Sequence, residues 1–210
     1  SIFGALLISV NPEILSPWEK ITKRIVDVLL SILAILILLP VFILLSFLIK
    51  TGSKGPIIFK QKRIGLYGNP FWIFKFRSMI TEAEKDGPQL SSQNDPRITA
   101  IGKFMRKTRL DETPQFFNVI KGDMAIVGPR PEREYYIEKI VVKAPHYKHV
   151  LKVKPGITSW GQIKFGYAEN VDEMVARLKF DLLYVENMSL SLDVKILFYT
   201  AIIMIKGDGK

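Results

Sequence analysis

One uncharged apolar segment constrains this chain more than any other feature of its sequence. Residues 28–49 read VLLSILAILILLPVFILLSFLI and contain no charged side chain. About 20 consecutive apolar residues are enough for an α-helix to cross the hydrocarbon core of a bilayer. By length alone, the segment therefore qualifies as a transmembrane helix.

The charges around this segment argue against a simple crossing. Basic side chains flank both of its ends, whereas a membrane-crossing helix usually carries them on the cytoplasmic side. The basic residues before the segment are Lys20, Lys23 and Arg24, and those after it are Lys50, Lys54, Lys60, Lys62 and Arg63. We therefore expect both ends on the same side of a membrane.

Pro40 lies in the middle of the segment and favours the same arrangement. Proline removes a backbone hydrogen bond and bends a helix. Residues 28–39 would form an arm of roughly 18 Å, which is too short to cross ~30 Å of hydrocarbon. We expect a re-entrant helix–break–helix over residues 20–52, broken near Pro40. A single proline-kinked span is the alternative.

The net charge limits the classes of partner. The 210-residue chain has 30 Lys and Arg against 20 Asp and Glu, a formal net charge of +10. Such an excess favours nucleic acid, anionic lipid or a phosphorylated substrate. Nucleic acid is disfavoured because the basic residues are dispersed and the apolar segment would have no role. The chain has no cysteine, which excludes disulfides and cysteine-based metal sites.

The rest of the sequence predicts short strands and helices, so the expected fold class is α+β and mostly helical. Residues 56–76 resemble a small β-hairpin with the turn YGNP, in which Gly68 and Asn69 suit positive φ. Asn170 and Glu173 form a capping box for a helix to about Glu186. The other expected helices cover residues 79–85, 100–107, 132–142 and 193–209, and one runs from Thr108 or Asp111 to Gly122.

Two adjacent carboxylates, Asp111 and Glu112, stand near a helix start in TRLDETPQFFNVIKGDMAIVGPR, residues 108–130, with arginines on both sides. A helix N-terminus stabilises an ionised carboxylate, and such a carboxylate can attack phosphorus to give an acyl phosphate. Its neighbour could bind Mg²⁺, and arginines could stabilise phosphoryl oxygens. Taken alone, the motif is more typical of an ordinary helix start, where acidic residues are common.

Several segments occur in an order that resembles the bacterial sugar transferase family of monotopic phosphoglycosyl transferases. They are KRIVDVLLSI, IFKQKRIG, FWIFKFRSM, DPRITAIGKFMRKTRLDETPQFFNVIKGDMAIVGPRPE, VKPGITSWGQI and SLDVKILFYT. The resemblance covers residues 18–210, and the long central block is its most specific part. It implies the catalytic part of a larger member, with residues 1–19 as a junction. Residues 53–210 would form an interfacial or cytosolic catalytic domain.

The resemblance also implies a reaction. A sugar 1-phosphate would pass from a nucleoside diphosphate sugar, expected to be a UDP-sugar, to a polyprenyl phosphate such as undecaprenyl phosphate. Nucleoside monophosphate would be released, and the product would start exopolysaccharide, capsule, O-antigen or glycoprotein glycan synthesis. The expected location is the cytoplasmic face of the bacterial inner membrane, in contact with membrane lipids, and the chain is compatible with a homodimer.

By the same resemblance, Asp111 is the nucleophile that forms a covalent phospho-sugar intermediate, and Glu112 is its partner and the Mg²⁺ ligand. The loop GPRP, residues 128–131, matches one associated with the nucleotide. The candidates for binding substrate phosphate or nucleotide are Arg106, Arg130, Pro129, Pro131, Lys75 and Arg77. A rival interpretation is a non-catalytic membrane adaptor that binds anionic lipids or a partner. It would explain the charge and the apolar segment, but not the carboxylate pair together with GPRP.

Overall fold

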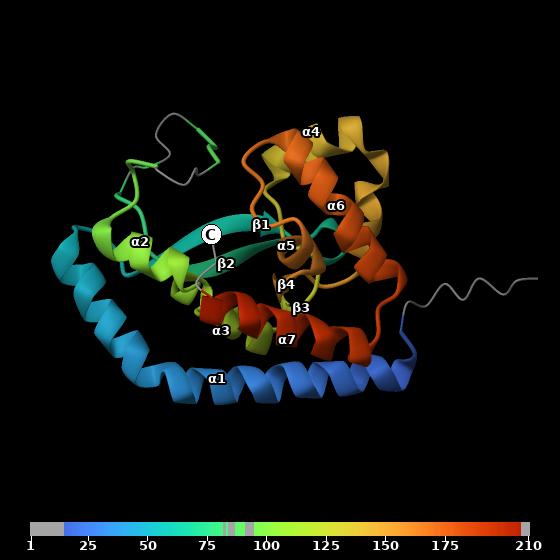
Figure 1. Ribbon diagram of the computed structural model, residues 1–210, viewed down its shortest axis with the longest axis horizontal. Helices are drawn as coiled ribbons and strands as arrows, with labels where there is room; N and C mark the ends of the chain where they lie inside the picture. Colours follow the sequence, from blue (N-terminus) through green and yellow to red (C-terminus); the bar gives the residue numbers. More distant parts are fainter. Residues whose placement is uncertain (1–14, 82, 84–86, 91–94, 207–210) are drawn as a thin grey trace, which may run out of the picture.

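A computed structural model describes residues 15–81, 83, 87–90 and 95–206 of the chain. Figure 1 shows one long helix along one side of the molecule, with the β-strands and the other helices stacked upon it. Residues 1–14, which make up most of the expected junction, lie outside the described residues.

The long helix is α1, Pro17–Gly52, and it holds the whole apolar segment. The backbone N–H of Ser16 donates to the Glu19 carboxylate at 3.0 Å, which pairs one of the donors that a helix start leaves open. Proline is tolerated in a first helical turn, so α1 includes Pro17 and begins before the expected boundary at residue 20.

The helix α1 continues through Pro40 instead of breaking there. Figure 1 shows that α1 changes direction along its length, and a proline inside a helix is the usual cause of a bend. The expected break is therefore a bend within one helix. Among the described helices, α1 is the one long and apolar enough to cross a membrane, and only 11% of its most apolar window is buried.

The expected hairpin is confirmed. Strand β1, Ile58–Ile64, pairs antiparallel with β2, Pro70–Phe76. The turn between them contains the 3-10 helix η1, Leu66–Gly68. Gly68 has positive φ as predicted, but the second residue with positive φ is Tyr67. The prediction for Asn69 was wrong, because its φ is −72°.

A second, parallel pair of strands was not predicted. Strand β3, Ala125–Val127, pairs with β4, Gly156–Thr158. The two backbones are so close that a Cβ on Gly156 would lie 2.1 Å from the Gly128 nitrogen. Strands this short show no clear alternation of polar and apolar residues, so they leave little local signal. Their pairing brings the GPRP loop against a segment distant in the sequence.

The predicted helices are largely confirmed. In the described part of the chain they are α2 (Ala100–Lys107), α3 (Gln115–Lys121), α4 (Glu134–Lys143), α5 (Trp160–Lys164), α6 (Val171–Glu186) and α7 (Leu190–Lys206), with the 3-10 helices η2 (Leu110–Glu112) and η3 (Pro145–Lys152). Asn170 caps α6 by accepting from the Glu173 N–H at 2.9 Å, as predicted. The helices α5 and η3 were not predicted.

Two predictions about helix starts were wrong. Thr108 closes α2 and Pro114 is the N-cap of α3, so neither Thr108 nor Asp111 caps that helix. A helix over residues 79–85 does not begin at Met79, because Met79 forms an isolated bridge with Ile98. Residues 82 and 84–86 lie outside the described part.

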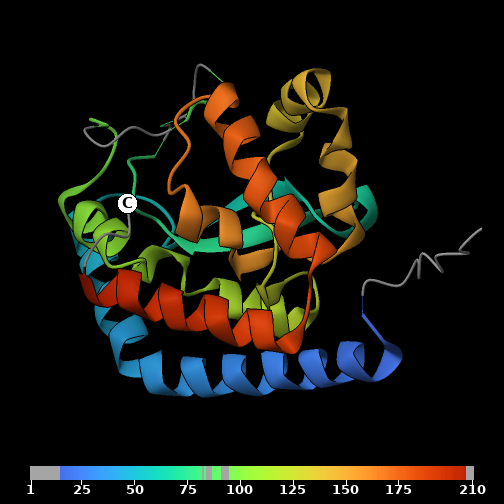
Figure 2. The same ribbon diagram turned by 45° about the vertical axis from the view of Figure 1, so that its right-hand side comes forward.

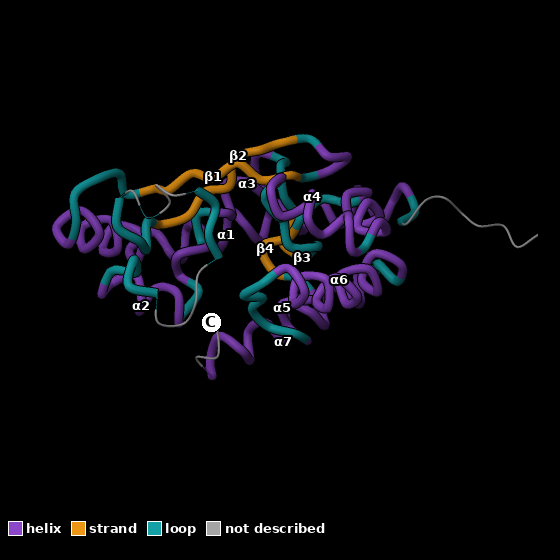
Figure 3. Tube along the Cα trace, turned by 90° about the horizontal axis from the view of Figure 1, so that it is seen from above, coloured by secondary structure: helices purple, strands orange, loops and turns teal. Residues whose placement is uncertain are grey.

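The elements pack in layers above α1. Figures 1 and 2 show α3 and α7 lying directly against α1, with α4 and α6 on the far side of the strands. Seen from above in Figure 3, the β1–β2 hairpin lies at one edge, and β3 and β4 lie nearer the middle. The main core joins strands β2 and β3 to α3, α4, η3, α6 and α7. A smaller core joins Leu45 and Ile49 of α1 to Phe76 and Met105.

Along most of its length, α1 exposes apolar side chains on the surface of the protein. The most exposed of these, each above 60%, are Trp18, Ile21, Leu29, Leu36, Ile37, Ile43 and Phe47. Helix α7 adds Val194 and Phe198. Soluble monomers rarely expose so large a continuous apolar patch, which is typical of a surface in contact with lipid or another protein.

Three basic side chains fasten α1 to the elements above it. Lys23 donates to the Val127 carbonyl at 3.1 Å, at the end of β3. Arg24 donates to carbonyls at the end of α3, and Arg77 donates to the Ser53 carbonyl at 2.7 Å, just past the end of α1. The apolar helix is therefore joined by hydrogen bonds to the elements that carry the predicted site.

Candidate active site

The two predicted catalytic carboxylates lie in the tight turn η2, between α2 and α3. Asp111 and Glu112 are each 7% exposed. Arg109, just before them, adopts the left-handed conformation with φ 59°. A residue with a side chain rarely adopts this conformation, and such strain is concentrated at functional sites. The reversal of the chain at Arg109 turns both carboxylates away from the path of α2.

Glu112 is held by three cations. Its Oε1 atom accepts from Lys75 Nζ at 2.6 Å and from Arg130 at 3.2 Å. Its Oε2 atom lies 3.4 Å from Arg109. Burial alone would raise the pKa of Glu112, but Lys75, Arg130 and Arg109 outweigh that effect and hold the pKa well below its usual range. Glu112 is therefore ionised at neutral pH.

Asp111 is in a different state. Within the described part of the chain, its carboxylate has neither a hydrogen bond nor a salt bridge, although it lines the cavity described below. Burial and the neighbouring charge of Glu112 raise the pKa of Asp111 to about 6, against the lowering effect of Lys75, Arg106 and Arg109. At neutral pH the carboxylate is still mostly ionised, but it is more basic than an ordinary aspartate. Asp111 lies in the first turn of the three-residue helix η2, but its pKa is raised, so the stabilisation of the ionised form expected from a helix N-terminus does not dominate.

Arg106 is positioned by close packing between α2 and the end of β2. A Cβ on Gly102 would lie 2.0 Å from the Ser78 carbonyl oxygen, so only glycine permits this approach. Thr99 caps α2 by accepting from the Gly102 N–H at 3.0 Å. Arg106 Nε then donates to the Ser78 hydroxyl at 2.9 Å. The charge of Arg106 lowers the pKa of Asp111, so the two side chains lie near each other. The role of Arg106 in binding substrate phosphate stays a prediction.

The GPRP loop presents Arg130 to the same place. Pro129 and Pro131 are buried, and their carbonyls accept from the Gly156 N–H at 2.9 Å and from Arg63 at 3.0 Å. The Arg130 guanidinium lies 6.0 Å from the centre of the Tyr167 ring. The buried prolines thus hold a loop that places the Arg130 guanidinium beside Glu112, and the binding roles predicted for Pro129, Arg130 and Pro131 stay predictions.

Gln162 completes this corner of the site. With its amide oxygen facing the arginines, it accepts from Arg130 at 2.5 Å and from Arg109 at 3.1 Å. Gln162, Arg109 and Tyr167 were not among the predicted site residues. Arg109 lies within the quoted motif TRLDETPQFFNVIKGDMAIVGPR, and Gln162 of α5 lies within the quoted segment VKPGITSWGQI, so both could have been included.

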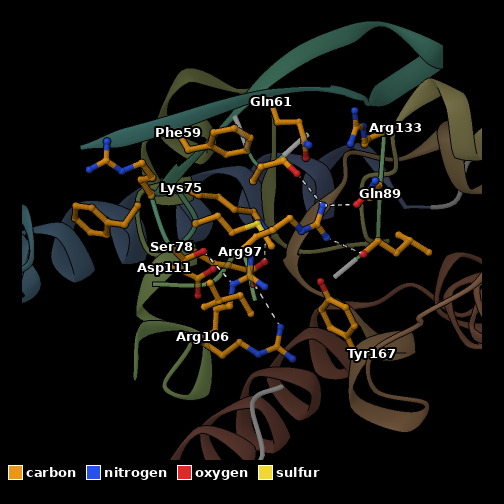
Figure 4. Close-up of a pocket in the computed structure, with 18 of the residues that line it drawn as sticks. Phe59, Gln61, Lys75, Ser78, Gln89, Arg97, Arg106, Asp111, Arg133 and Tyr167 are labelled. Carbon is orange, nitrogen blue, oxygen red and sulfur yellow. Dashed lines mark hydrogen bonds and ion pairs between the residues drawn. The ribbon is translucent and has the colours of Figure 1, made fainter. Parts of the chain in front are cut away.

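A cavity of about 830 Å³ opens beside the carboxylates, within the usual size range of ligand pockets. Figure 4 shows Phe59 and Lys75 on one side of it and Arg133 and Tyr167 on the other. Asp111, Glu112 and all four of their neighbouring cations line it: Lys75, Arg106, Arg109 and Arg130. With four positive charges around two negative ones, the cavity suits an anion of two or more charges.

Farther from Asp111, the cavity wall is strongly polar. Glu132 is buried and forms salt bridges with Arg63 and Arg177. Arg133 and Tyr136 line the same region. This end offers donors and acceptors together, as recognition of a polar organic group requires.

The predicted residue Arg77 has a different set of contacts. It lines the cavity, but its two terminal nitrogens donate to carbonyls of Ile49, Ser53 and Lys54 at the end of α1. These contacts fasten the helix, and a role in phosphate binding stays a prediction. Lys75, two residues earlier, points to Glu112 instead. Residues two apart face the same side only while a strand continues, and β2 ends at Phe76, before Arg77.

The described residues do not form a ready metal centre. They contain no group of three or more Asp, Glu, His or Cys side chains placed to hold a metal ion. Both Glu112 oxygens already face cations, so Glu112 does not fit as a preformed Mg²⁺ ligand. The two histidines of the chain, His146 and His149, are exposed.

An apolar surface helix joined to a cation-rich cavity with a buried acidic pair defines a membrane-associated protein with a site suited to phosphorylated ligands. The chain belongs to the bacterial sugar transferase family, because the family model described as "Bacterial sugar transferase" matches residues 18–207. This finding confirms the resemblance noted in the sequence.

Individual relatives agree with the family assignment. The chain is 41% identical over 194 residues to the UDP-N-acetylgalactosamine-undecaprenyl-phosphate N-acetylgalactosaminephosphotransferase of Aeromonas hydrophila, over 92% of this chain and 46% of that protein. It is 41% identical to the UDP-glucose:undecaprenyl-phosphate glucose-1-phosphate transferase of Klebsiella pneumoniae, over 87% of this chain and 40% of that protein. The chain thus spans less than half the length of these two relatives.

Proposed function

We propose that this chain transfers a sugar 1-phosphate from a UDP-sugar to undecaprenyl phosphate and releases UMP. The names of the relatives describe reactions of this kind for those proteins. The cavity supports the proposal because its cations match the charge of a diphosphate and its polar end could bind a nucleoside or a sugar.

The observation that carries the proposal is the unequal state of the two carboxylates. Glu112 is neutralised by three cations, so its oxygens are poor nucleophiles. The Asp111 carboxylate is unpaired among the described residues, faces the cavity and has a raised pKa. Greater basicity favours attack on phosphorus. We assign the nucleophile to Asp111 and assign to Glu112 the task of holding Lys75, Arg109 and Arg130 in place.

The reaction then has two steps. An Asp111 oxygen forms a bond to the phosphorus that bears the sugar, and the bond from this phosphorus to the bridging oxygen breaks, so that UMP leaves with the electron pair. Next, a phosphate oxygen of undecaprenyl phosphate attacks the same phosphorus. The bond to Asp111 breaks, and the products are the lipid diphosphate sugar and the free carboxylate. Arg106 and Arg130 would stabilise the charged oxygens in both steps.

We propose that Mg²⁺ takes part in the reaction, but that Glu112 does not bind it before the donor arrives. Mg²⁺ commonly binds through one or two carboxylates together with substrate phosphates. Here the donor diphosphate would supply most of the ligands, with an oxygen of the acidic pair as the protein contribution. The bound ion would neutralise charge on the leaving phosphate. Loss of UMP release after chelation, restored by added Mg²⁺, is the expected result.

The exposed apolar face of α1 supports placement in a membrane, where the lipid acceptor resides. We propose that α1 enters the cytoplasmic leaflet and that its bend returns the chain to the same face. Labelling of cysteines introduced at positions 22 and 53 tests this. Labelling from one side is expected, and labelling from opposite sides would establish a span. A homodimer stays a prediction.

The catalytic proposal is tested with Asp111→Asn and a donor labelled in the sugar. Without acceptor, the unchanged chain should release about one UMP per enzyme in a burst and retain labelled sugar phosphate, whereas Asp111→Asn should do neither. Substantial turnover by Asp111→Asn would refute the nucleophile assignment. If no nucleotide sugar yields UMP even with Mg²⁺ and undecaprenyl phosphate, the adaptor interpretation is favoured.

A further inference from the structure

The two ends of the cavity differ in chemistry. The polar end contains the buried Glu132 and its arginine partners. The opposite rim, which we call the α2 rim, consists of Phe59, Ile80, Lys103 and Lys107, all of which line the cavity. Phe59 and Ile80 are 41% and 50% exposed, and both lysines are exposed. The α2 rim therefore combines accessible apolar surface with positive charge.

The α2 rim leads to the reacting carboxylate. Lys103 and Lys107 are one turn apart on α2, so they share a helix face. Arg106 belongs to the same helix, is less exposed than either lysine, and lowers the pKa of Asp111 by its charge. Positive charge thus continues from the exposed rim to the buried site.

The α2 rim also lies beside the apolar helix. Met105 of α2 packs against Leu45 and Ile49 of α1, and Arg77 joins the end of β2 to the end of α1. Figures 1 and 2 show α2 next to the last part of α1 and far from α4 and α6. The neighbouring part of α1 exposes Ile43, Leu44 and Phe47, so apolar surface lies close to the rim.

We propose that the α2 rim is the entry and binding site for the phosphate head of the lipid acceptor, and that the UDP-sugar occupies the polar end. Lys103 and Lys107 would bind the phosphate before Arg106 guides it toward Asp111, and Phe59 and Ile80 would contact the first isoprene units. A lipid phosphate combines an apolar chain with a compact anion, which matches the rim and not the polar end. This assignment rests on the proposed function.

The two half-reactions provide the test. The double variant Lys103→Gln with Lys107→Gln, in detergent micelles containing undecaprenyl phosphate, should raise the acceptor KM by about tenfold or more. The burst of UMP release without acceptor should be unchanged, which also shows that the variant is folded. Replacement of both lysines by arginine should retain the acceptor KM within about twofold. Lys179→Gln, at an exposed lysine of α6 outside the cavity lining, is the matched control.

Two results would overturn the assignment. An unchanged acceptor KM in the glutamine double variant, with a normal burst, would show that lipid phosphate binds elsewhere. A burst reduced in proportion to turnover would show that the lysines serve the donor. If the unchanged chain gives no burst with any donor, the proposed function fails and the assignment fails with it.

Discussion

The ammonium group of Lys75 lies 2.6 Å from the carboxylate of Glu112. Lys75 comes from the β-hairpin and Glu112 from the turn η2, so this salt bridge joins two walls of the cavity. Because it is more than four-fifths buried on both sides, removing one partner would leave a poorly compensated charge. The contact therefore couples the shape of the cavity to its electrostatics.

We first predict the effect of removing Lys75. Lys75→Met should slow UMP release by about a hundredfold, because a cation that stabilises the anionic transition state is lost and the pKa of Glu112 rises. Single-turnover UMP release measures this. Lys62→Met is the control, since Lys62 is an exposed lysine on the neighbouring strand that does not line the cavity. An equal decrease in the rate of UMP release in both variants would contradict a specific role for Lys75.

The second prediction concerns pH. Asp111 must be ionised to attack, and its pKa is raised to about 6. The rate of the donor half-reaction should therefore fall as the pH drops through about 6, instead of near the ordinary value of 3.8. Single-turnover rates measured from about pH 5 to about pH 8 would reveal this decrease in rate. A rate that stays constant down to about pH 5 would show that the nucleophile has an ordinary pKa.

The third prediction is that Asp111→Asn stabilises the protein at neutral pH. The stability that protonated Asp111 contributes is fully present below 3.8 and is lost as the pH rises through about 6. The neutral amide avoids this loss, so the free energy of unfolding should increase on the order of 1–3 kcal/mol above pH 6.

Thermal unfolding in detergent at several pH values measures the effect of Asp111→Asn. The stabilisation should shrink as the pH approaches about 4. Glu138→Gln, at an exposed position of α4, is the control. Any change that it makes in the stability of the protein should not follow this pH dependence. A destabilised Asp111→Asn at neutral pH would mean that the ionised carboxylate is favourably solvated in the fold.

The fourth prediction separates two roles for Arg77. Its guanidinium donates to three carbonyls at the end of α1, so Arg77→Met should lower the free energy of unfolding by about 1–3 kcal/mol. The donor KM should change by less than about twofold. A large rise in donor KM with unchanged stability would instead support the phosphate-binding role expected from the sequence.

The fifth prediction concerns Lys23, which lies 2.6 Å from Asp193 of α7, with both side chains about nine-tenths buried. Lys23→Met should lower the free energy of unfolding by about 3–5 kcal/mol, because Asp193 is left without its cation. The double variant with Asp193→Asn should recover part of this loss. Unfolding measured for the full double-mutant cycle gives the coupling, and additivity of the two single changes would contradict it. Lys50→Met, at an exposed lysine of α1, is the control.

Elements with strong local signals were predictable. The hairpin follows from the alternation of residues 56–76 around a glycine turn, and α6 follows from the cap formed by Asn170 and Glu173. The pair β3 and β4 was missed because its partners lie far apart in the chain and are three residues each. Pro40 was expected to break the helix, but one side of α1 packs against α3 and α2, and this packing favours continued helix at the proline.

The sequence by itself determined the apolar helix, the hairpin and the presence of an acidic pair among arginines, because these depend on neighbouring residues and their spacing. Only the tertiary structure showed that the pKa of Asp111 is raised while that of Glu112 is lowered. The pKa of each carboxylate depends on burial and on charges from distant positions such as Lys75 and Arg130. Coulomb interactions fall with distance and strengthen in a buried site, so adjacent residues of similar chemistry acquire different properties once folding sets those distances.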